Sequence, residues 1–224
     1  MPFYIPPVLR TQIWFSIISV RLCDTFKSFA GCVFRLYLIN AVLLKVFAKV
    51  NPIKFFKKIL PAQIVAFSTQ SSAGTLPVAT EILTDKIGVS GKVANVTTPL
   101  GITIGMPGCA GIWPILVSLY GIYGLGINFS LTDYITLVVV ALFVSFGTAG
   151  VPGTATVTTA SVLTVMGLPL ELIVLTIPIS ALADTGRTAT NITGAMVSAT
   201  IVARQEDSLD DEIFEKEDEE ENKA

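Results

Sequence analysis

Histidine is absent from this chain of 224 residues, and cysteine is rare, with three residues. Without histidine the chain can form no Ser-His-Asp triad, no histidine-ligated zinc site and no imidazole proton relay. The irregular spacing of Cys23, Cys32 and Cys109 indicates neither a disulfide framework nor a metal cluster. A proline pair stands where a cleavable signal peptide has its basic region, so no such peptide is predicted.

Charge is also scarce. Charged residues make up 14% of the chain and hydrophobic residues 52%, with a mean hydropathy of +0.70, which is typical of an integral membrane protein. The exception is the acidic tail, residues 206–224, which has no apolar periodicity. We expect this tail to be disordered and cytoplasmic.

Asp184 and Arg187 lie within an otherwise apolar segment, residues 170–203, that is long enough to cross a bilayer. A charge in the middle of a membrane costs about 2.5–3.5 kcal/mol on insertion scales, so such residues usually face a water-filled or protein-lined site. Positions i and i+3 share one face of a helix. A carboxylate and a guanidinium on one face can bind the ammonium and the carboxylate of a zwitterion. The pair therefore predicts an amino-acid site.

Residues 55–87 and 131–168 each contain two apolar arms separated by small polar residues, at 68–77 and at 147–153. Each arm is shorter than the roughly 20 residues that span a bilayer. A backbone break at membrane depth is tolerated where it is buried in protein or lines a cavity. We interpret both segments as re-entrant helical hairpins. The alternative is a pair of ordinary helices joined by a turn outside the membrane.

Each hairpin is followed by a spanning segment that contains a break. Residues 93–123 are interrupted at 101–108, and the helix with Asp184 follows the second hairpin at a similar spacing. This repetition predicts an inverted repeat with its site at the membrane midplane. The lysines of residues 45–58 place the start of the first hairpin in the cytoplasm. Trp113, Tyr120 and Tyr123 are predicted to form an interfacial aromatic belt.

Three motifs carry a resemblance to a known family: SSAGTLP (71–77), GTAGVPG (147–153) and DTGRTATNITG (184–194). They resemble the dicarboxylate/amino acid:cation symporters of the glutamate-transporter superfamily, from about residue 36 to residue 205. The resemblance implies an all-α integral membrane protein, the C-terminal half of an elevator-type transporter. Its transport domain would be residues 35–205, preceded by an unassigned segment, residues 1–34. Full-length members imply a homotrimer in the plasma membrane.

The resemblance also implies roles for individual residues. Asp184 would bind the substrate ammonium and Arg187 the distal carboxylate. The first hairpin tip would donate to the α-carboxylate, and the second tip would act as the extracellular gate. The remaining residues implied for the substrate are Ser71 and Ser72 of the first tip, Ala149, Gly150, Val151, Pro152 and Gly153 of the second, and Cys109, Thr188 and Asn191.

Departures from the family pattern concern the coupling ion, Na⁺ or H⁺; no other cofactor and no nucleic acid is implied. Gly105-Met106-Pro107-Gly108-Cys109 stands where the family has Asn-Met-Asp-Gly-Thr, and Ala195 stands where it has an aspartate. A buried cation needs compensating charge, so two of the three sodium sites are predicted to be lost. The third site, built mainly from backbone carbonyls, would comprise Thr103, Met106, Ser145, Phe146 and Thr148.

Several readings of substrate and chain remain open. Residues 108–111 and Ala195 resemble the cystine-uptake branch, but the charged pair suits aspartate, glutamate or C4-dicarboxylates as well. The match covers only the second half of the family's chain, which also allows a truncated product, half of a split transporter or a non-transporting fragment. A channel would show rings of polar residues. An intramembrane aspartyl protease would need two carboxylates, so no enzyme is predicted.

Overall fold

The computed structural model describes residues 30, 33–34, 36–104, 106–147 and 153–216, and every regular element among them is a helix. The predicted all-α class is therefore confirmed. The longer helices are α2 Pro52–Thr69, α3 Ser72–Ile82, α4 Gly91–Ile104, α5 Trp113–Leu125, α6 Leu131–Ser145, α7 Thr154–Val165 and α8 Glu171–Gln205. The short ones are the π-helical segments η1 Leu44–Ala48, η2 Leu83–Ile87 and η3 Pro107–Ile112, and the α-helix α9 Asp211–Glu215.

Helices α2 and α3 form the first helical hairpin. Its turn consists of Gln70, which has a left-handed backbone with φ of 52°, and Ser71, whose hydroxyl accepts a hydrogen bond from the Gly74 amide at 3.0 Å. Because Ser71 caps the helix, α3 begins at Ser72. The interruption predicted at residues 68–77 is thus correct in place but too long.

Helices α6 and α7 form the second hairpin. A capping box between Ser130 and Asp133 begins α6. Gly153, with φ of 85°, lies immediately before α7, a backbone conformation that glycine adopts without strain. Residues 148–152 of the predicted interruption lie outside the described residues.

The two predicted spanning segments are both bent or broken. Helix α4 ends at Ile104, and helical structure resumes at Pro107 in η3 and continues into α5. The break is therefore shorter than the predicted 101–108. Helix α8 contains Pro178, which cannot donate a backbone hydrogen bond, and its axis turns by 77° between Glu171–Ser180 and Leu182–Gln205.

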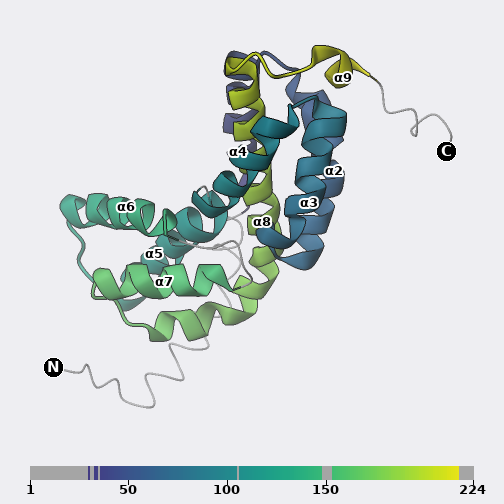
Figure 1. Cartoon of the computed structure of the whole chain (residues 1–224). Coiled ribbons are helices and arrows are strands. Elements are labelled where there is room, and N and C mark those ends of the chain that lie inside the picture. Colours follow the sequence, from purple (N-terminus) through teal and green to yellow (C-terminus); the bar gives the residue numbers. More distant parts are fainter. Residues whose placement is uncertain (1–29, 31–32, 35, 105, 148–152, 217–224) are drawn as a thin grey trace.

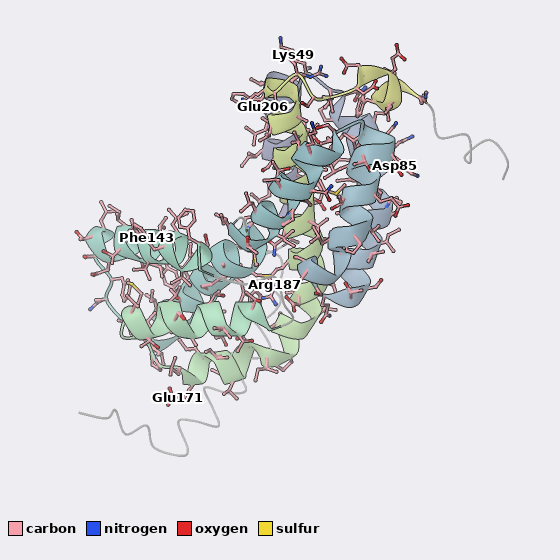
Figure 2. All side chains as sticks on the ribbon, viewed as in Figure 1. Lys49, Asp85, Phe143, Glu171, Arg187 and Glu206 are labelled. Carbon is pink, nitrogen blue, oxygen red and sulfur yellow. The ribbon has the colours of Figure 1, made fainter. Side chains whose placement is uncertain are left out.

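The molecule has two arms that meet at an angle (Figure 1). One arm contains α2, α3, α4 and the second part of α8 around one hydrophobic core. The other contains η3, α5, α6, α7 and the first part of α8 around a second core. Figure 2 shows Arg187 where the arms meet, and Lys49, Asp85 and Glu206 at the outer end of the first arm. The two segments that pass from arm to arm are therefore those that contain the breaks.

Among the described residues, one helical segment is long and apolar enough to cross a membrane, or up to three if each bent pair is one span. Residues Gly91–Leu125 have the length and hydropathy of a span, and two bent pairs, Leu36–Ala48 with Pro52–Thr69 and Glu171–Ser180 with Leu182–Gln205, pass the same test when each is taken as one span. Large apolar side chains are also exposed, including Leu131 at 77%. Such exposure is unusual on a protein surrounded by water and is expected on a lipid-facing surface.

Two glycines of the first broken segment, one in α4 and one in η3, lie close to helix α8. A Cβ added to Gly101 would lie 2.9 Å from the Cβ of Ala195, and one added to Gly108 would lie 2.9 Å from the carbonyl oxygen of Arg187. Ala195 is buried, with 2% of its surface exposed. The position where the family has an aspartate is thus filled by contact between α4 and α8.

The close approach at Gly108 gives a test of the packing. We expect Gly108→Ala to lower the melting temperature of the chain in detergent, because overpacking costs about 1–3 kcal/mol and the added methyl would push η3 away from α8. The matched control is Gly111→Ala, whose Cβ would meet no atom within 4 Å. Melting temperatures that are equal for the two variants would contradict this packing.

Part of the acidic tail is ordered, which corrects the expected disorder for residues 206–216. Helix α9 lies in this segment, and Phe214 is buried, with 1% of its surface exposed. The Ser90 amide donates to the carbonyl of Ser208 at 2.9 Å, and the Asp210 amide donates to the carbonyl of Gly88 at 2.8 Å. The sequence did not indicate this because a single phenylalanine gives no periodicity. Residues 217–224 lie outside the described residues.

The ammonium of Lys58 holds this segment to the first hairpin. Lys58 is buried, and its Nζ donates to the carbonyls of Lys86 at 2.9 Å, Ile213 at 3.3 Å and Lys216 at 3.0 Å. The same ammonium lies 5.4 Å from the centre of the Phe214 ring. One buried cation thus joins η2 and α9 through their terminal carbonyls.

We expect Phe214→Ala to release residues 206–216, because removing a buried phenylalanine costs about 3–5 kcal/mol. Hydrogen–deuterium exchange should become roughly tenfold faster or more in this segment and remain unchanged in α5. The control is Glu215→Gln, which removes the exposed ion pair with Lys54 and should change exchange little. Protection that persists in Phe214→Ala would show that the phenylalanine does not anchor the tail.

Candidate functional site

A small pocket lies where the breaks of the chain come together. Its volume is about 10 Å³, room for about one water molecule. The lining comes from the turn of the first hairpin, the break before η3, the start of α7 and the middle of α8. The residues are Gln70, Ser72, Met106, Cys109, Thr154, Asp184, Thr188 and Asn191. Both hairpins and both broken segments therefore contribute to one site.

Asp184 and Arg187 form an ion pair at this site. The Nη2 of Arg187 lies 2.9 Å from the Oδ1 of Asp184, and only 1% of the arginine side chain and 13% of the aspartate side chain are exposed. Nη2 also donates to the carbonyl oxygen of Ser180 at 2.9 Å and to its hydroxyl at 3.2 Å. The two side chains share one face of α8, as expected, and they neutralise each other at the edge of the pocket.

The pair retains unused hydrogen-bonding capacity. Arg187 Nε and Nη1 are buried and have no acceptor among the described residues. The Oδ2 of Asp184 has no hydrogen-bond donor within the described part of the chain, and Asp184 lines the pocket. A buried donor without an acceptor costs about 1–3 kcal/mol. The arginine is therefore suited to an additional anionic acceptor, and the aspartate to an additional cationic donor.

Two helix N-termini border the same pocket. Ser72 and Thr154 are the first residues of α3 and α7, and both line it. The first amides of a helix have no partner within the helix, and its N-terminus carries a partial positive charge. These ends therefore favour a carboxylate in the pocket.

Asn191 connects the two segments that carry the breaks. Its Oδ1 accepts a hydrogen bond from the Gly108 amide at 2.9 Å, and its Nδ2 donates to the Sγ of Cys109 at 3.2 Å. The thiol of Cys109 lies 3.8 Å from the Oδ1 of Asp184. The hydroxyl of Thr188 donates to the carbonyl of Asp184 within α8. These groups line the pocket while they also hold η3 against α8.

Six of the eight predicted substrate residues that the structure describes lie together. Those that line the pocket are Ser72, Cys109, Asp184, Thr188 and Asn191, and Arg187 adjoins it through Asp184. Ser71 is not among the lining residues, because its hydroxyl caps α3. Gly153 is exposed before α7. Ala149, Gly150, Val151 and Pro152 lie outside the described residues.

Two lining residues were missed from the sequence. Gln70 is the only long polar side chain in the first interruption, and Thr154 is the first residue after the second one. Their positions next to the predicted breaks were the available signal. The missed residues extend the site by one position at each hairpin.

The residues predicted for a sodium site are more dispersed. Met106 is buried and lines the pocket. Thr103 is exposed, and its hydroxyl donates to the carbonyl of Pro99 at 3.0 Å. Ser145 is half-buried and Phe146 is exposed at the end of α6, while Thr148 lies outside the described residues. Of the described members of this set, the structure brings only Met106 to the pocket.

Comparison with known proteins gives a consistent result. The Sodium:dicarboxylate symporter family matches residues 13–205, starting earlier than the motifs indicated. An uncharacterized symporter of Haemophilus influenzae is 44% identical over 195 residues, which cover 87% of this chain and 44% of the relative. The L-cystine uptake protein TcyP of Bacillus thuringiensis is 36% identical over 178 residues, 79% of this chain and 38% of the relative.

The L-cystine uptake protein TcyP of Shouchella clausii is 36% identical over 208 residues, which cover 92% of this chain and 44% of the relative. The chain thus spans less than half the length of these curated relatives. The family name and the names of the relatives describe transporters and not enzymes, as expected. On this evidence the chain belongs to the sodium:dicarboxylate symporter family.

Proposed function

We propose that this chain forms the substrate-binding half of a cation-coupled transporter whose substrate is cystine. The observation that carries the proposal is the buried Asp184–Arg187 pair at the pocket between the two hairpins. The names of two relatives, which are L-cystine uptake proteins, favour cystine over aspartate, glutamate and C4-dicarboxylates. Cystine has an ammonium and a carboxylate at each end, so it offers both partners that the pair needs.

In this proposal the Oδ2 of Asp184 accepts a hydrogen bond from the substrate ammonium. The unpaired Nε and Nη1 of Arg187 bind the distal carboxylate, because a guanidinium binds a planar carboxylate through two parallel hydrogen bonds. The N-terminus of α3, which begins at Ser72, binds the near α-carboxylate, while Ser71 caps the helix. Thr188 and Asn191 complete the polar lining.

The pocket is too small for cystine as it stands, so binding requires the hairpins to separate. We assign the extracellular gate to residues 149–153 at the tip of the second hairpin, by resemblance to the family. The whole transport domain would then move across the membrane as an elevator, on a homotrimeric scaffold that other parts of the family's chain supply. Relatives about twice as long as this chain are consistent with such a division.

We place the protein in the plasma membrane with several spans and with the tail in the cytoplasm. Lys49 and Glu206 lie at the outer end of the first arm (Figure 2), and Lys45, Lys54 and Lys57 are near Lys49 in the sequence. Positive charge near the ends of spans marks the cytoplasmic side. Because α8 ends at the same place, the acidic tail leaves on that side.

We propose coupling to a single cation, Na⁺ being favoured by the name of the family. Ala195 replaces one carboxylate and packs against Gly101, and Pro107 replaces another. A cation bound in an apolar interior without a carboxylate has only neutral oxygens to compensate its charge. The proposed site keeps Thr103, Met106, Ser145, Phe146 and Thr148, which would act mainly through backbone carbonyls.

The assignment of Arg187 predicts a loss that depends on the ligand. Arg187→Lys keeps the charge but removes the planar fork, so binding of cystine should weaken by roughly tenfold or more. Binding of S-methylcysteine, which lacks the second carboxylate, should weaken much less. Calorimetry on the chain in lipid nanodiscs measures both affinities. The control is Arg204→Ala on the same helix, far from the pocket, where the guanidinium pairs with Asp211.

Two outcomes decide this test. Equal losses of affinity for cystine and S-methylcysteine would show that Arg187 does not bind the distal carboxylate. An unchanged affinity for cystine in Arg187→Lys, with the same melting temperature as the parent, would do the same.

The coupling proposal predicts a Hill coefficient of about one for sodium-dependent cystine uptake, as a single cation site requires. The measurement is uptake into proteoliposomes at increasing Na⁺, with the scaffold part of the protein present. Ala195→Asp is expected to destabilise the protein, because it would bury a carboxylate against Gly101. A Hill coefficient close to three would contradict the loss of two sites.

A further inference from the structure

Trp113 was expected at the membrane interface, and the structure places it in the interior. It is the first residue of α5, and only 2% of its surface is exposed. The guanidinium carbon of Arg187 lies 4.3 Å from the centre of its ring. The distance is that of a cation stacked on an aromatic face, an interaction that is stronger when it is desolvated.

The stacking fixes the orientation of the guanidinium. Trp113 covers one face, while Nη2 is held in the plane by Ser180 and Asp184. Because the guanidinium is held on one face and at Nη2, its other donors can point in only one direction. These donors, Nε and Nη1, are the ones without an acceptor among the described residues.

We propose that Trp113 is a positioning residue that determines specificity for substrates with a second carboxylate. The proposal rests on the function proposed above. The indole holds Nε and Nη1 in a plane in which a carboxylate can bind edge-on, and it blocks approach to the face that it covers. A ligand without the second carboxylate gains nothing from this orientation. The selectivity of the site therefore depends on a side chain that need not touch the substrate.

The alternative is that Trp113 only fills the second hydrophobic core, of which it is a member. A packing role would lower stability and would weaken all ligands equally when the side chain is shortened. If Trp113 has a positioning role, shortening it weakens the binding of cystine selectively, and another aromatic side chain at this position restores that binding. The two roles can therefore be separated by comparing ligands and by comparing substitutions.

The test compares Trp113→Leu and Trp113→Phe in lipid nanodiscs, with calorimetric titration of cystine and of S-methylcysteine. We expect Trp113→Leu to weaken cystine by about tenfold, and Trp113→Phe to recover most of that loss. S-methylcysteine should change by less than about twofold in both. The matched control is Phe55→Leu, a buried aromatic residue of the other core, which should leave both affinities unchanged.

Intrinsic fluorescence gives a second readout that does not depend on the stability of Trp113→Leu. The chain has two tryptophans, so Trp14→Phe leaves Trp113 as the only one. Cystine should change the emission of Trp113, because its carboxylate offsets the electric field of the stacked guanidinium at the indole, and S-methylcysteine should not. Arg187→Ala should abolish the cystine response.

The outcomes separate the two proposals. Equal weakening of both ligands in Trp113→Leu, or an emission unaffected by cystine, overturns the positioning role and leaves the proposed function intact. If the parent chain binds neither ligand, the proposed function fails and the positioning role fails with it. Selective loss of cystine with recovery in Trp113→Phe supports both.

Discussion

The buried guanidinium of Arg187 is the constraint on which the centre of the structure depends. A charge removed from water needs compensation on every side, and each neighbour of Arg187 supplies part of it. Side chains on a helix point toward its N-terminus, so Arg187 reaches back to Asp184 and Ser180 on its own helix. Trp113 covers one face of the guanidinium with its ring. Because Gly108 has no side chain, η3 can approach the backbone of α8 at Arg187.

The breaks in the helices serve the same site. An uninterrupted helix presents no free amide in its middle, whereas a helix that begins in the interior presents several. The starts of α3 and α7, with Ser72 and Thr154, and the break before η3 all border the pocket. Helices that begin at the pocket turn their N-terminal ends, with their partial positive charge, toward it.

The sequence allowed the helical class, the hairpins and the charged pair to be predicted, because apolar arms, small polar breaks and isolated charges are local signals. It did not allow tertiary contacts to be predicted. An aromatic residue such as Trp113 at the end of an apolar run fits a membrane interface as well as a stacked cation. Phe214 and Lys58 meet only after the chain folds. Ser71 was predicted to line the pocket, but it caps α3, and its neighbour Gln70 lines the pocket instead. A difference of one position is too small for pattern analysis to detect.

Charge balance links the proposed substrate to the altered cation sites. Asp184 and Arg187 together contribute no net charge, and cystine, as a double zwitterion, adds none. A site that encloses cystine therefore remains neutral without additional cations, whereas enclosed aspartate or glutamate would add a negative charge that bound cations must offset. By the resemblance to the family, Ala195 and Pro107 stand at positions where carboxylates would hold such cations. In the proposed function, the absence of these carboxylates and a neutral substrate thus follow from one electrostatic requirement.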